Sequence, residues 1–203
     1  MMKLLRRSLI AAAIAAPVLA LAAANVDAPA PAFTATTADG KTVNLADYKG
    51  KTVVLEWTNA DCPYVRKHYG SGNIPTQQKA ATAQGVVWLQ VISSAPGQQG
   101  FVDGAEARKL NAERGAAPTA TLLDPKGDLG KLYGAQTTPH LFVIKGDGTL
   151  AYKGGIDSIA SPDKADIAKA EPYVTEALAA VAAGRKVEKA STRPYGCSVK
   201  YAS

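Results

Sequence analysis

Short apolar runs alternate with segments of helical spacing through most of the chain. Runs rich in β-branched and apolar residues are typical of strands that are buried on both faces of a sheet. We expect such strands at residues 52–57, 86–92, 120–123 and 141–144. A Gly-Asp-Gly turn predicts that the last of these forms an antiparallel hairpin with residues 150–153. This order of elements predicts a three-layer α/β fold in which helices flank a mixed central sheet.

Helical spacing and turn residues predict the other elements. Glycine and proline break the chain at residues 70–75, and the final helix is rich in alanine, with Ser161 as its candidate cap. One expected helix begins after residue 62. The others span residues 76–84, 103–114, 129–133 and 163–183. An Asp-Gly turn between residues 33–37 and 41–45 predicts a β-hairpin as an N-terminal extension. Residues 185–203 form a C-terminal tail with no clear period, and the sequence contains no internal repeat.

The N-terminus has the pattern of a secretory signal peptide. Residues 1–7 contain Lys3, Arg6 and Arg7, an apolar segment follows at 9–20, and Ala22-Ala23-Ala24 offers a cleavage site. We therefore expect residues 1–24 to be removed and the protein to reach the periplasm or another exported location. The apolar segment is short for a spanning helix and none follows it, so an uncleaved anchor is the lesser alternative. Residues 25–32, rich in alanine and proline, should form an extended lead-in without structure of its own.

The net charge of the chain adds little to these expectations. The 203 residues carry 23 basic and 17 acidic side chains, and cleavage after Ala24 would remove three bases and no acid, reducing the net charge from +6 to +3. Such a mild excess gives no reason to expect a nucleic-acid partner. An exported protein meets an oxidising environment, in which its two cysteines, Cys62 and Cys197, are able to pair.

Cys62 lies where a buried strand should give way to a helix. The preceding residues, among them Asn59, are turn and N-cap types, and Pro63 is compatible with a first helical turn. Free backbone N–H groups and the helix dipole favour a thiolate at such a position, and Arg66 is expected to add positive charge one turn later. The alternative is that Cys62 belongs to a structural disulfide or is a small core residue.

The order of elements, the place of Cys62 and a Thr138-Pro139 pair before a strand resemble the thioredoxin-like fold. The closest likeness is to its redoxin branch, the alkyl hydroperoxide reductase/thiol-specific antioxidant type, and it covers a domain at residues 33–184. The segments TNADCPYVRKHY and YGCSVKY are also similar to a subgroup of exported thioredoxin-family proteins. This resemblance implies that Cys62 is the attacking thiol and that Pro139 follows a cis peptide bond beside it. It also implies that the backbone of Thr138 pairs with an extended substrate strand.

The chain departs from its relatives at informative positions. Val65 occupies the place of the second cysteine of a thioredoxin, so the usual local disulfide cannot form. Leu55 and Asn59 occupy places where a typical peroxiredoxin has the proline and threonine that help to bind peroxide. Two substrate classes therefore stay open, a protein thiol or disulfide and a small peroxide. The reductant is left unidentified, and no cofactor is expected.

Cys197 leads to two further hypotheses. If the tail folds back over Cys62, Cys197 serves as a distant resolving cysteine in an oxidoreductase cycle. Alternatively, the two cysteines form a permanent disulfide in a non-catalytic envelope module. Both hypotheses require that the sulfur atoms meet. A copper site formed by Cys62 and His140 is a third, weaker hypothesis, because the chain offers few soft ligands.

Overall fold

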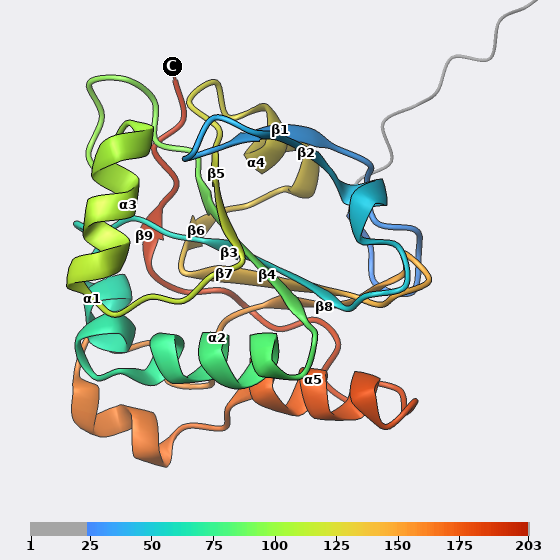
Figure 1. Ribbon diagram of the computed structural model, residues 1–203. Helices are drawn as coiled ribbons and strands as arrows, with labels where there is room; N and C mark the ends of the chain where they lie inside the picture. Colours follow the sequence, from blue (N-terminus) through green and yellow to red (C-terminus); the bar gives the residue numbers. More distant parts are fainter. Residues whose placement is uncertain (1–23, 203) are drawn as a thin grey trace, which may run out of the picture.

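The computed structural model describes residues 24–202, so the predicted signal peptide lies outside the described residues except for Ala24. A seven-stranded sheet has the order β2-β1-β5-β4-β3-β7-β8 (Figure 1). The sheet is mixed, because β3, β4 and β5 run parallel and the other neighbours pair antiparallel. The strands are β1 (Thr34–Thr37), β2 (Thr42–Asn44), β3 (Val53–Trp57), β4 (Val87–Ile92), β5 (Ala120–Leu123), β7 (His140–Ile144) and β8 (Leu150–Gly154). The predicted α/β class, the mixed sheet and the N-terminal hairpin are confirmed.

Helices cover both faces of the sheet. They are α1 (Pro63–Gly70), α2 (Asn73–Ala83), α3 (Gly104–Glu113), α4 (Asp128–Tyr133) and α5 (Tyr173–Ala182), with 3-10 turns η1 (Leu45–Tyr48) and η2 (Lys164–Lys169). In the described part of the chain, none of these is long and apolar enough to cross a membrane. The figure shows α2 and α5 on one side of the sheet and α4 on the other (Figure 1).

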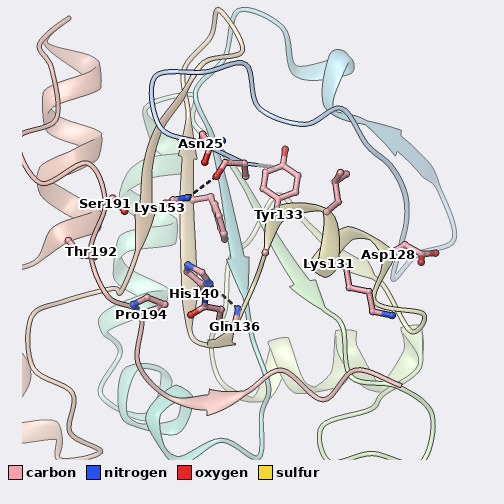
Figure 2. Close-up of a pocket in the computed structure, with 14 residues that line it drawn as sticks. Asn25, Asp128, Lys131, Tyr133, Gln136, His140, Lys153, Ser191, Thr192 and Pro194 are labelled. Atoms are coloured by element: carbon pink, nitrogen blue, oxygen red, sulfur yellow. Dashed lines mark hydrogen bonds between the residues drawn. The ribbon is translucent and has the colours of Figure 1, made fainter. Parts of the chain in front are cut away.

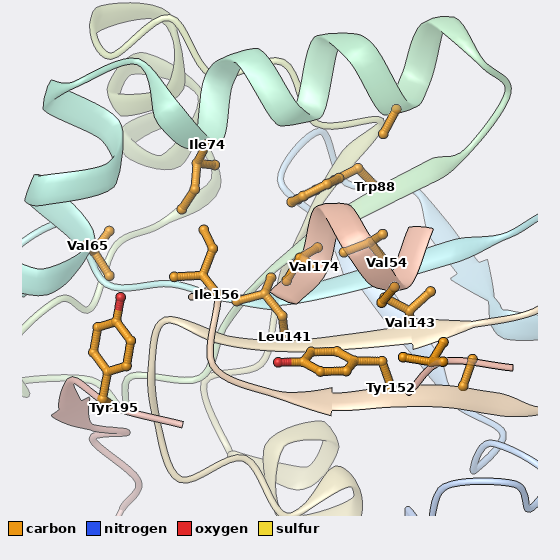
Figure 3. Packing of buried hydrophobic residues seen from close by; sticks show 14 of the residues in the cluster. Val54, Val65, Ile74, Trp88, Leu141, Val143, Tyr152, Ile156, Val174 and Tyr195 are labelled. Carbon is orange, nitrogen blue, oxygen red and sulfur yellow. The ribbon is translucent and has the colours of Figure 1, made fainter. Parts of the chain in front are cut away.

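Side chains on β3 alternate between two cores, as the twofold period of a strand requires. Val54 packs with side chains of α1, α2 and α5 (Figure 3), whereas Val53, Leu55 and Trp57 pack on the opposite face with α4. All five residues of β3 are buried. The loop at residues 58–61, which leads to Cys62, therefore starts from a fully buried central strand.

The predicted final helix at 163–183 is wrong in its continuity. The structure has η2 and α5 instead, separated by residues 170–172. Pro172 explains the break, because proline lacks a backbone N–H and disfavours helical conformation in the preceding residue. Ser161 does not cap a helix: the side chain of Asp163 accepts the N–H of Ala165 at the start of η2, and Ser161 Oγ accepts the N–H of Asp163.

The start of α2 and the contacts of the N-terminal lead-in add to the prediction. The break at 70–75 is shorter than expected, because α2 begins at Asn73 and Pro75 lies in its first turn, where no proline N–H is needed. Backbone hydrogen bonds hold residues 25–32, the expected lead-in. The N–H of Asp27 donates to the carbonyl of Leu150, and that of Ala30 donates to Gly148, both at 2.9 Å, so the segment docks against the β7–β8 hairpin.

The tail carries a short strand that the sequence did not reveal. β9 (Cys197–Ser198) pairs antiparallel with β6 (Thr137–Thr138), just before β7. Beyond β9, the N–H of Val199 donates to Gln136 and the N–H of Ala95 donates to Lys200. The tail is thus part of the folded body, and it brings Cys197 to the N-terminal end of α1.

Candidate functional site

Cys62 is the N-cap residue of α1, directly after the loop that leaves β3. Asn59 shapes this loop: its side-chain oxygen accepts the N–H of Asp61, and its carbonyl accepts the N–H of Cys62 at 3.1 Å. Pro63 is the first helical residue, and the N–H of Arg66 closes the first turn on the Cys62 carbonyl. The cysteine is therefore placed by ordinary turn and helix-start chemistry, and its side chain is 0% exposed.

The segment before β7 lies against the sulfur. The Thr138–Pro139 peptide bond is cis, the isomer that the resemblance implies. The Cys62 thiol donates to the carbonyl of Thr138 over 3.1 Å. The structure thus places Cys62 beside Thr138 and Pro139, which lie more than seventy residues later in the sequence.

The tail completes the site from the other side. Cys197 is the register partner of Thr138, and its backbone N–H donates to Sγ of Cys62 over 3.4 Å. Gly196 makes this close approach possible, because its φ is +132° and a Cβ at this position would collide with the carbonyl of Thr138. Both cysteines are free thiols; Cys62 is buried and Cys197 is partly exposed.

The surroundings of the two thiols drive their pKa values apart. Burial opposes ionisation of Cys62, but hydrogen bonds from the Cys197 thiol and from the backbone N–H groups of Val65 and Cys197 lower its pKa overall. Burial and the hydrogen bond to Cys62 raise the pKa of Cys197 to about 11. The Cys62 sulfur is therefore the one that carries negative charge more readily.

Arg66 does not contribute as expected. Its side chain is exposed, Nε donates to the Ala60 carbonyl, and its guanidinium faces the Asp61 carboxylate at 3.6 Å. Among the described residues, no hydrogen bond links the side chain of Arg66 to Cys62. Charge stabilisation at the sulfur comes instead from backbone amides of α1 and of the tail.

A buried polar cluster that sequence reasoning missed anchors the tail. The hydroxyl of Tyr195 donates to Asp157 and accepts from Nε2 of His68 at 3.1 Å, while Nδ1 of His68 accepts from Asn73. The buried ammonium of Lys67 lies 3.8 Å from the Asp157 carboxylate. Figure 3 shows Tyr195 with its hydroxyl directed toward α1. No periodic signal marks this cluster, since its members come from α1, α2, the segment after β8 and the tail.

Glu56 forms a second buried cluster that sequence reasoning missed. Its carboxylate accepts from Tyr69 at 2.6 Å, from Trp88 at 2.7 Å and from Gln78 at 2.9 Å. Burial raises the pKa of Glu56 despite these donors. A lone glutamate inside an otherwise apolar strand was the available signal, because a buried carboxylate requires hydrogen-bond partners.

His140 lies outside the two-sulfur site. It lines a cavity of about 730 Å³ together with Tyr133, Gln136 and Lys153 (Figure 2), and Cys62 is not among the residues of this cavity. Nδ1 of His140 accepts the N–H of Gln136 at 3.2 Å. The copper hypothesis for Cys62 and His140 thus gains no support. Within residues 24–202, no three or more His, Cys, Asp or Glu residues are grouped to hold a metal ion.

Comparison with known proteins gives one family and many structures. The AhpC/TSA family model matches residues 26–153 of the chain. A conserved protein from Geobacillus kaustophilus is 23% identical with a TM-score of 0.74, and the alignment covers 88% of this chain and 93% of that one. A protein from Sinorhizobium meliloti 1021 is 21% identical with a TM-score of 0.69, covering 88% and 96%. A comparison with curated proteins found no match.

A further solved structure, from Chlorobium tepidum, is described as a thiol:disulfide interchange protein DsbE. It is 25% identical with a TM-score of 0.52, and the alignment covers 64% of this chain and 84% of that one. The likeness lies in the shared sheet and helices, which confirms the predicted thioredoxin-like fold.

Proposed function

The chain belongs to the AhpC/TSA family of redoxins, and from this we propose that it is an exported thiol-disulfide oxidoreductase that cycles between a dithiol and a Cys62–Cys197 disulfide. Cys62 is the nucleophile and Cys197 is its resolving partner. One observation carries the proposal: the backbone N–H of Cys197 donates to Sγ of Cys62 over 3.4 Å, so the two cysteines lie against each other. A disulfide requires two cysteines whose backbones lie close together, and the contact between the Cys197 backbone and the Cys62 sulfur supports this pairing.

The electrostatics of the pair support the cycle. A lowered pKa increases the fraction of Cys62 that is thiolate at neutral pH. It also makes the Cys62 sulfur a better leaving group when the disulfide is reduced. Thr138 and Pro139 position the sulfur: the Thr138 carbonyl accepts the hydrogen bond of the Cys62 thiol, and Pro139 follows the cis peptide bond beside it. The DsbE-type structure from Chlorobium tepidum agrees with exchange between thiols and disulfides.

Peroxide reduction is the less favoured candidate. Leu55 is buried in apolar packing, and the side chain of Asn59 is engaged with Asp61 and Gln99, so neither position offers a donor at the sulfur. The Cys62 side chain is 0% exposed, which closes the direct approach of a peroxide. Export rests on the signal-peptide pattern at residues 1–24, which the described residues do not include apart from Ala24.

The test is equilibration of the full mature chain in mixtures of reduced and oxidised dithiothreitol, with the disulfide content read by thiol alkylation and mass spectrometry. We expect a reversible, two-electron transition that joins Cys62 to Cys197. Turnover of a small disulfide should be abolished in Cys62→Ser. A bridge that resists excess dithiothreitol would favour the non-catalytic envelope module, and a rate with hydroperoxide exceeding that with the disulfide would favour the peroxidase.

A further inference from the structure

The tail closes the approach to Cys62. β9 pairs with Thr138, on the strand edge where the family resemblance implies that an extended substrate would pair. Contacts hold the tail on both sides of β9: Tyr195 bonds Asp157 and His68 before it, and the hydroxyl of Tyr201 donates to Ala135 after it. A polypeptide must therefore displace several hydrogen bonds before it reaches the edge at Thr138.

Cys197 is the accessible half of the pair. It is partly exposed, whereas Cys62 is fully buried beneath the tail and the segment before β7. In a disulfide between them, an external sulfur can approach in line with the S–S bond only from the side of Cys197. The side chain that leaves is then Cys62, which remains beside the N–H groups of Cys197 and Val65.

We propose that small anionic thiols react at Cys197, so that the external sulfur bonds to Cys197 and Cys62 is the leaving group. This inference rests on the proposed disulfide cycle and names its substrate class. It assigns to Cys197 the contact with the external thiol in the reductive half of the cycle, in which Cys62, the nucleophile of the oxidative half, is the leaving group.

Two thiols reduce the Cys62–Cys197 disulfide in two exchange steps. A low-molecular-weight thiol loses its proton to solvent, and its thiolate forms an S–S bond to Cys197 while the Cys62–Cys197 bond breaks. The electron pair of the broken bond stays on Cys62 as a thiolate. A second thiolate then attacks the external sulfur of the mixed disulfide, which releases a small disulfide and leaves Cys197 to take a proton from solvent. Two thiols are oxidised, and one protein disulfide is reduced.

Lys200 gives the reason for an anionic substrate. Its ammonium lies 3.1 Å from the hydroxyl of Ser198, the residue next to Cys197, and its positive charge acts on the Cys197 sulfur. A thiol that carries a carboxylate is attracted to this place, and a thiol that carries an ammonium is repelled. The effect of one exposed charge is modest, roughly two- to fivefold in rate at low salt.

The first experiment locates the mixed disulfide. The oxidised full chain is mixed briefly with glutathione, quenched with acid, alkylated and digested for mass spectrometry. We expect glutathione on Cys197 and the alkyl group on Cys62, and the opposite assignment overturns the inference while the proposed function stands. If neither glutathione nor dithiothreitol reduces the oxidised protein, the proposed function fails as well.

The second experiment tests the substrate class. Rates are compared per thiolate for glutathione, neutral 2-mercaptoethanol, cationic cysteamine and an extended cysteine peptide. Lys200→Gln should lower the glutathione rate roughly two- to fivefold and leave 2-mercaptoethanol unchanged. Lys79→Gln on the exposed face of α2 is the matched control. A peptide rate above that of glutathione would show that the tail moves aside and lets polypeptides reach Thr138. An unchanged glutathione rate in Lys200→Gln would show that there is no preference for anionic thiols. Either result overturns the proposal.

Discussion

The backbone N–H of Cys197 donates a 3.4 Å hydrogen bond to Sγ of Cys62, across a sequence separation of 135 residues. A hydrogen bond from the thiol of the same residue also contributes to the lowered pKa of Cys62. The position of the tail consequently controls two properties of Cys62, its ionisation and its exposure, and these can be separated by substitution.

Substitution of Cys197 tests the control of ionisation. The hydrogen bond from the Cys197 thiol lowers the pKa of Cys62, so Cys197→Ala should raise that pKa. Cys197→Ser retains a side-chain donor of similar size and should give a value closer to that of the wild type. The ultraviolet absorbance of the thiolate, followed against pH, measures the difference. Equal values in the two variants would show that the side-chain donor is irrelevant.

Gly196→Ala tests the control of exposure. The added methyl group would collide with the Thr138 carbonyl and push β9 off β6. We expect a loss of about 1–3 kcal/mol in the free energy of unfolding and much faster alkylation of Cys62 in the reduced protein.

Gly134→Ala is the matched control for this substitution, because Gly134 also has a positive φ but open space around its Cβ position. It should cost about 1 kcal/mol without exposing Cys62. Alkylation of Cys62 at the wild-type rate in Gly196→Ala would mean that β9 does not shield the sulfur.

Tyr195→Phe tests the anchor of the tail. The hydroxyl satisfies Asp157 and Nε2 of His68 in a buried place, so its removal should destabilise the fold by about 1–3 kcal/mol. Tyr64→Phe is the control, since Tyr64 packs edge-on against Tyr195 but its hydroxyl has no hydrogen bond within the described residues. Chemical denaturation measures both variants, and equal stabilities would contradict the role of the hydroxyl.

Acid should destabilise the protein through its two histidines. Burial lowers the pKa of His68 to about 4 and that of His140 to about 3, against an ordinary value of 6.5. Below pH 6.5 these histidines bind protons in the unfolded chain but stay neutral in the folded chain. Their contribution to the free energy of unfolding is therefore fully present above pH 6.5 and is lost as the pH decreases toward 4. The limiting slope is about 1.4 kcal/mol per pH unit for each histidine.

Denaturation at a series of pH values measures this slope. His140→Gln should reduce it by about half, because one of the two titrating groups is lost. A slope that does not change in this variant would show that His140 is not responsible.

The site was only partly predictable. Cys62 and Pro139 were found because a buried strand, an N-terminal helix position and an X-Pro pair leave local marks in the sequence, and the family match confirms the redoxin resemblance that they suggested. Arg66 was expected to face the sulfur, but helix position alone does not reveal that Asp61 draws its guanidinium away. Tyr195 and Asp157 were not identified, because a buried hydrogen bond between distant residues leaves no local pattern.

The α/β class, the order of the elements along the chain and the location of Cys62 at the start of α1 could be predicted from the residues alone, because apolar spacing and turn residues act over a few neighbours. The added strand beside Thr138 and the placement of Cys197 against Cys62 were visible only in the folded chain. The physical reason is that this pairing depends on backbone hydrogen bonds, a glycine contact and a buried tyrosine, whose partners become neighbours only after the chain has folded.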